Sequence, residues 1–127
     1  MSASSGMRVI AAAAADAGGL PPARAVRLAD EVEYARGSIV SRTVARQRGG
    51  SLTLFAFDAG QELSEHTAPF DAVVQVLDGR AELVVGGQRV EAAAGETVVM
   101  PAHVPHAVRA GERFKMLLTM VRGLEAR

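Results

Sequence analysis

Hydrophobic and polar residues alternate, or gather in short apolar blocks, along most of the chain. Residues 51–57 (SLTLFAF) alternate, which places Leu52, Leu54 and Ala56 on one face. Residues 72–77 (AVVQVL) form a nearly continuous apolar run, which predicts a strand buried on both faces. No ten-residue amphipathic pattern competes with these segments, so the pattern favours strands over helices.

Glycine-containing turns separate the predicted strands. Asp78-Gly79 and Gly86-Gly87 are strong hairpin signals, and they bracket a strand over residues 80–85. Further strands are expected over residues 38–45, 88–92, 97–100, 106–109 and 114–121. Many short strands, with turns roughly every 8 to 12 residues, predict an all-β, single-domain antiparallel barrel or jelly roll.

Composition narrows the choice of partners. The 127 residues make about one domain, and 49% of them are apolar, although the chain has no Trp and only one Tyr. Acidic and basic residues balance at 14 each, so we expect no nucleic-acid partner. No apolar stretch is long enough to cross a membrane as a helix, so no membrane partner is expected either. Cysteine is absent, which excludes disulfides and thiolate chemistry.

The N-terminal region differs from the remainder of the chain. We expect residues 1–23 to be an Ala-rich, disordered tail and residues 24–127 to be the barrel domain, because Gly18-Gly19 and Pro21-Pro22 break any helix. The apolar run at 9–15 is short and Asp16 follows it, which disfavours a secretory signal. We therefore expect a cytoplasmic protein.

Two spaced motifs lie in residues 60–79 and 95–110. Their anchors are Gly60, His66 and Gly79 in the first, and Gly95, Pro101 and His106 in the second. At these positions the chain resembles the cupin family, whose first motif carries two His and a Glu and whose second carries one His. The resemblance spans residues 36–121. It implies a cupin-like barrel, and a homodimer for which residues 39–45 are a candidate edge strand.

The chain departs from the family pattern at four positions. The second His of the first motif falls on Ala68 and its Glu on Ala72, while His103 and Ala110 replace a Gly and an Asn. In metal-bearing cupins the three His and the Glu surround one ion, so this chain keeps two of four ligands, His66 and His106.

A divalent transition metal (Fe, Mn, Ni or Zn) therefore needs further ligands, since such sites normally take three or four from the protein. Two weaker candidates are His103, in a turn three residues before His106, and Asp71, beside the lost Glu position. Asp71 would face inward only if the strand slipped by one residue. Without such a ligand, no cofactor is expected.

The resemblance implies that His66 and His106 point into the barrel from neighbouring strands and face one another. Phe70, Val74 and Val76 are the expected apolar neighbours in this ligand pocket. Gln75 is the one polar residue in its run. It either orients a ligand or faces solvent, because burying an unpaired amide is costly.

Three functions remain open at this point. The first is a barrel that binds a small-molecule ligand in a two-histidine pocket. The second is a metal-dependent oxygenase or isomerase that uses His66 and His106 with an unconventional third ligand. The third is a structural or dimerisation module with a relict pocket. The sequence identifies no catalytic residue and leaves open whether the protein is an enzyme, because one fold supports unrelated functions.

Overall fold

The computed structural model describes residues 19–122, which form eight β-strands and one short 3-10 turn, Leu28–Asp30. The strands are β1 (Ile39–Gln47), β2 (Gly50–Phe57), β3 (Glu62–His66), β4 (Asp71–Val85), β5 (Gln88–Ala93), β6 (Thr97–Met100), β7 (His106–Arg109) and β8 (Phe114–Val121). All strand pairs are antiparallel, so the predicted all-β class is confirmed. Within the described residues, no helix has the length and apolar character needed to cross a membrane.

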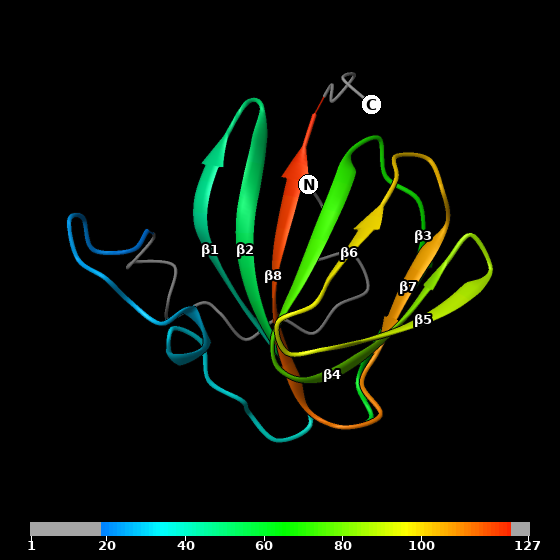
Figure 1. Cartoon of the computed structure of the whole chain (residues 1–127), viewed down its shortest axis with the longest axis horizontal. Helices are drawn as coiled ribbons and strands as arrows, with labels where there is room; N and C mark the ends of the chain where they lie inside the picture. Colours follow the sequence, from blue (N-terminus) through cyan, green and yellow to red (C-terminus); the bar gives the residue numbers. More distant parts are fainter. Residues whose placement is uncertain (1–18, 123–127) are drawn as a thin grey trace.

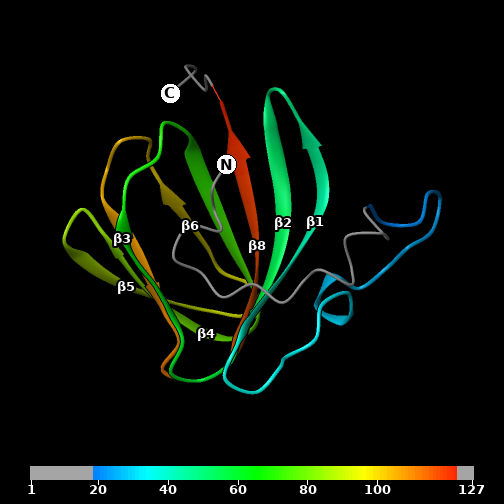
Figure 2. The same ribbon diagram turned by 180° about the vertical axis from the view of Figure 1, so that it is seen from behind.

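One long strand, β4, belongs to two sheets. Its first half pairs with β6 and β8, and its second half pairs with β5 and β7. The order β1-β2-β8-β4 completes the first sheet, and β3 is the outer neighbour of β7 in the second. In Figures 1 and 2 the two sheets meet where β4 bends and diverge from there. β1 ends the strand order, as expected for the candidate dimer edge, while dimerisation itself stays a prediction.

The predicted hairpin at Asp78-Gly79 is wrong, because β4 continues through it. The register against β8 shifts between Val76 and Asp78, which leaves Leu77 as an extra residue, and Gly79, two residues later, has φ +74°. The extra residue makes a β-bulge, which bends a strand without reversing it. The hairpin predicted at Gly86-Gly87 is confirmed, since Val85 pairs directly with Gln88 and both glycines have positive φ.

The core lies between the two sheets. Phe57 and Phe114 stack at 4.5 Å between ring centroids, and Phe55 lies beside Phe57 at 6.0 Å. The run 72–77 was expected to be buried on both faces, but only one face is fully buried: Gln75 is exposed on the other face. The side chains of Ala72, Val74 and Val76 point inward, so this strand alternates like its neighbours.

Residues 19–37 pack on the outer face of the first sheet. Of the predicted tail, residues 1–18 lie outside the described residues, whereas the Gly19 carbonyl accepts a hydrogen bond from Arg42. Val32 packs with Leu54 and Ala56 in a second, smaller cluster. The Tyr34 hydroxyl also donates to Asp78, at the bulge of β4. The N-terminal segment therefore covers part of the outer sheet face beside β1 (Figure 1).

Replacing Gly79 should show how far the fold depends on the β4 bulge. An alanine Cβ at this position would lie 2.2 Å from the Arg113 carbonyl oxygen, in a left-handed backbone conformation. We expect Gly79→Ala to lower the free energy of unfolding by about 2–4 kcal/mol. Gly87→Ala is the matched control: its φ is +83° but no atom lies within 4 Å, so backbone strain alone should cost about 1–2 kcal/mol. The free energy of unfolding of each variant is measured by urea denaturation. Equal losses in Gly79→Ala and Gly87→Ala would contradict the close packing described for Gly79.

The carboxylate of Asp58 should make stability depend on pH. It accepts a hydrogen bond from the Gly37 N–H at 2.6 Å and one from Arg113 at 3.3 Å. These contacts, the Gly37 bond first, hold the pKa of Asp58 below its ordinary value of 3.8. The folded state thus favours the carboxylate, and its contribution is present above that value and lost as the pH falls through the lowered pKa. Asp58→Asn should lower the melting temperature near neutral pH, with a difference that shrinks in acid. A difference that is constant with pH would argue against this role.

Candidate functional site

His66 and His106 form a directly opposed pair across strands β3 and β7. Their Cα atoms are register partners in this antiparallel pair, and their ring centroids lie 4.4 Å apart in an edge-to-face arrangement. Side chains at opposed positions of neighbouring strands project from the same face of the sheet. The resemblance-based expectation that the two rings face one another therefore agrees with the geometry.

A bulge in β3 shapes the surroundings of His66. Leu63 pairs with Val108 and His66 with His106, so β3 carries one extra residue between these two pairs. The carbonyl of Ser64, within this bulge, lies 2.8 Å from the Nδ1 atom of His66. Bulges of this kind redirect side chains beside functional sites.

Hydrogen bonds to the backbone set the tautomer of both neutral imidazoles. A carbonyl oxygen can only accept, so His66 donates from Nδ1 to Ser64, and His106 donates from Nδ1 to Val104 at 3.1 Å. In each neutral ring the lone pair then lies on Nε2. The pair thus presents two hydrogen-bond acceptors, or two metal-ligating atoms, to whatever occupies the adjoining space.

The two rings differ in burial. His106 is 5% exposed, whereas His66 is exposed to solvent. Burial lowers the pKa of His106 below its ordinary value of 6.5, and the neighbouring His66 lowers it further, against the opposing effect of the Val104 carbonyl. Burial therefore favours the neutral form of His106.

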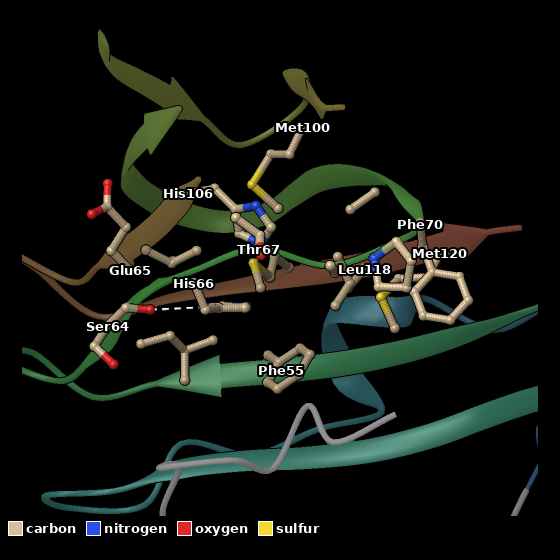
Figure 3. A pocket seen from close by; sticks show the side chains of 16 residues that line it. Phe55, Ser64, Glu65, His66, Thr67, Phe70, Met100, His106, Leu118 and Met120 are labelled. Atoms are coloured by element: carbon tan, nitrogen blue, oxygen red, sulfur yellow. Dashed lines mark hydrogen bonds between the residues drawn. The ribbon is translucent and has the colours of Figure 1, made fainter. Parts of the chain in front are cut away.

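The histidine pair lies at one end of a cavity of about 530 Å³ between the two sheets. In Figure 3 His66, Ser64 and Glu65 lie at one end, while Phe70 and Met120 lie at the other. The polar lining residues are Ser64, Glu65, His66, Thr67 and His106. The rest of the lining is apolar: Phe55, Leu63, Ala68, Pro69, Phe70, Ala72, Met100, Val108, Met116, Leu118 and Met120.

Not all of the predicted pocket residues reach this cavity. Phe70 lines it together with the two histidines. Val74 and Val76 are buried in the main core cluster and are not among the lining residues. Gln75 is exposed on the outer face of β4, which is the second of the two alternatives left open for it.

The two weaker metal candidates have structural roles at the rim of the barrel. The Asp71 carboxylate is buried and accepts a hydrogen bond from the Ala102 N–H at 3.0 Å. His103 is exposed, has φ +66° and donates its backbone N–H to the Ala68 carbonyl at 2.8 Å. The two contacts fasten the 101–105 turn to the first residue of β4 and to the segment that precedes it. Neither side chain lines the cavity.

The donor set does not fit a tightly held divalent metal. No group of three or more His, Cys, Asp or Glu residues within residues 19–122 is arranged to hold an ion. Ala68 and Ala72, which occupy the family's other two ligand positions, both line the cavity. The wall that would complete a coordination shell is apolar instead, and two imidazoles alone fall short of the usual three or four ligands.

Sequence reasoning missed most of the apolar lining. The predicted pocket did not include Met100, Met116, Leu118 and Met120, all of which line the cavity. The alternation over 114–121 places Met116, Leu118 and Met120 on one inward face, which was the available signal. Glu65, at an exposed position of β3, also borders the polar end.

Comparisons with known proteins agree with this architecture. Residues 53–121 match the family described as the cupin domain. A Streptococcus pyogenes protein, SPY1581, described as of unknown function, superimposes with a TM-score of 0.80 at 36% identity; the match covers 85% of this chain and 95% of that one. A cupin 2 conserved barrel domain protein from Leptotrichia buccalis gives 0.72 at 42% identity, over 74% of this chain and 46% of that one.

The chain is also similar in sequence to a protein of Streptomyces coelicolor. The uncharacterized protein SCO3923 of Streptomyces coelicolor is 39% identical over 61 residues, which cover 48% of this chain and 58% of that protein. The match to the cupin domain spans more than half of the 127 residues, and it includes both histidines and all of the residues that line the cavity. The chain therefore belongs to the cupin family.

Proposed function

We propose that this cupin binds a small organic molecule in the cavity between its sheets, with His66 and His106 holding the polar group of that molecule. The observation that carries the proposal is the position of the directly opposed imidazole pair at one end of an otherwise apolar cavity. Ligand sites are commonly concave, mainly apolar and supplied with a few convergent polar groups, and about 530 Å³ lies in their usual size range.

The cost of burying His106 supports a binding role over a purely structural one. The ring is nearly inaccessible to solvent and its pKa is lowered, so the protein bears a desolvation cost at this position. A residue that served only to pack this site would be an apolar side chain of similar size. Residues that lower the stability of the folded protein in this way are typical of functional positions.

A metal-dependent oxygenase or isomerase is the second candidate. The two Nε2 atoms favour it, because imidazole nitrogens ligate iron, nickel and zinc. The alanines at positions 68 and 72 count against it, since they leave the ion without further protein ligands in the cavity. Metal content therefore separates the two candidates.

Ligand binding can be tested with a chemically diverse fragment panel and backbone amide NMR. We expect some fragments to shift resonances of cavity residues such as Thr67 and Leu118. The His66→Ala, His106→Ala double variant should lose at least about tenfold in affinity for them, because a polar anchor is worth about 1–3 kcal/mol. Gln75→Ala, on the outer face of β4, is the matched control and should bind as the wild type does. The proposal fails if no fragment binds in the cavity, or if the double variant remains folded and binds the panel equally well.

Metal content should be low. When the protein is purified without chelator and dialysed, we expect elemental analysis to find well under one equivalent of Fe, Mn, Ni or Zn per chain. The reason is that two imidazole ligands without a third hold such ions weakly. One equivalent that survives dialysis and disappears in the double variant would instead favour the metal-dependent enzyme.

A further inference from the structure

We propose that the cavity selects an aromatic molecule bearing an uncharged hydrogen-bond donor, such as a phenolic hydroxyl, and that it rejects carboxylates. This inference rests on the proposed small-molecule binding and names the class of ligand. It follows from the direction of the hydrogen bonds at the polar end, the charges in the wall and the shape of the apolar end.

The polar end offers acceptors. Each imidazole uses its Nδ1–H on a backbone carbonyl, Ser64 for His66 and Val104 for His106. The lone pairs on Nε2 are left for the ligand, and in Figure 3 the His66 ring extends away from Ser64 toward the cavity. A ligand hydroxyl can donate to such an atom, whereas a carboxylate oxygen would bring one lone pair against another.

The wall does not offset the charge of an anion. No lysine or arginine is among the described residues that line the cavity, and the one acidic lining residue, Glu65, turns its carboxylate away from the histidine rings in Figure 3. An anion moved from water into this space would lose hydration without gaining an opposite charge. An ammonium group could donate to Nε2, but its charge would be offset only by the exposed Glu65 carboxylate, and a surface ion pair of that kind contributes little. An uncharged donor avoids both costs.

The opposite end suits a flat ring. Phe70 and Met120 offer aromatic and thioether surfaces at this end, and Phe55 lies between it and the histidines (Figure 3); such surfaces pack well against aromatic groups. The Arg122 guanidinium lies over the Phe70 ring, 4.9 Å from its centroid, without itself lining the cavity. The ligand is thus oriented with its donor toward the histidines and its ring toward Phe70.

Three naphthalenes of similar size test this selectivity: 2-naphthol, 2-methoxynaphthalene and 2-naphthoate. The ether keeps the ring and the oxygen of the naphthol but removes the donor, while the carboxylate adds the negative charge. Each is titrated into the full chain by calorimetry at slightly alkaline pH, where an imidazole is neutral and a phenolic hydroxyl keeps its proton. We expect 2-naphthol to bind about tenfold or more tightly than either of the others, which corresponds to one hydrogen bond to a partly buried acceptor.

Two variants locate the selectivity. His66→Leu removes one acceptor at an exposed position, so the fold should tolerate it, and the preference for 2-naphthol over the ether should fall to roughly two- to threefold. Gln75→Ala changes an exposed residue on the outer face of β4 that does not line the cavity, and it should keep the preference of the wild type.

Several results would overturn the inference. The inference is wrong if 2-naphthoate or 2-methoxynaphthalene binds as tightly as 2-naphthol. It is also wrong if the His66→Leu variant keeps the full preference of the wild type for 2-naphthol over the ether. If none of the three naphthalenes binds while the fragment panel identifies other cavity ligands, the ligand class is wrong although the cavity binds small molecules. If no compound of the fragment panel binds in the cavity, the proposed function itself is wrong.

Discussion

The shared strand β4 is the constraint from which the rest of the architecture follows. Because one continuous strand pairs with β6 and β8 in one sheet and with β5 and β7 in the other, the apolar faces of the two sheets are held against each other. The bulge at Leu77 and the positive φ of Gly79 permit this change of partners, and the Tyr34 hydroxyl braces the same place from outside through Asp78. Phe55, Phe57 and Phe114 are among the core side chains that fill part of the space between the sheets, and the cavity occupies another part.

The cavity combines an apolar wall with one polar end. The register of β3 against β7 puts two imidazoles opposite each other, and backbone carbonyls fix which nitrogen of each neutral ring donates. Alanines stand where the resemblance to metal-bearing cupins places the other ligands, so the space beside the histidines is open and apolar. In the proposed function that space receives an organic group.

Most strands and the face-to-face histidines were predictable, whereas the continuity of β4 and the extent of the cavity were not. The Asp78-Gly79 pair has the composition of a hairpin turn, and only its tertiary surroundings show that β4 continues through it. The strand bulges at Leu77, and the Arg113 carbonyl lies close against Gly79. Strand β3 escaped prediction because Glu62–His66 is mostly polar and exposed, without alternation. The alternation of apolar and polar residues shows that Val74 and Met116 both point inward, but it cannot show which of them lines the cavity. The position of the cavity depends on how side-chain volumes from both sheets fill the interior.

The central claim is that each of the two imidazoles, in its neutral form, carries its proton on Nδ1 and has its lone pair on Nε2, at the polar end of the cavity. Long-range ¹H–¹⁵N correlation spectra of the histidine rings, recorded at slightly alkaline pH, report the tautomer of each ring directly. The structure predicts that His66 and His106 both show a protonated Nδ1 and an unprotonated Nε2. An Nε2–H tautomer at either ring would contradict the account, because that ring would then offer a donor to the ligand.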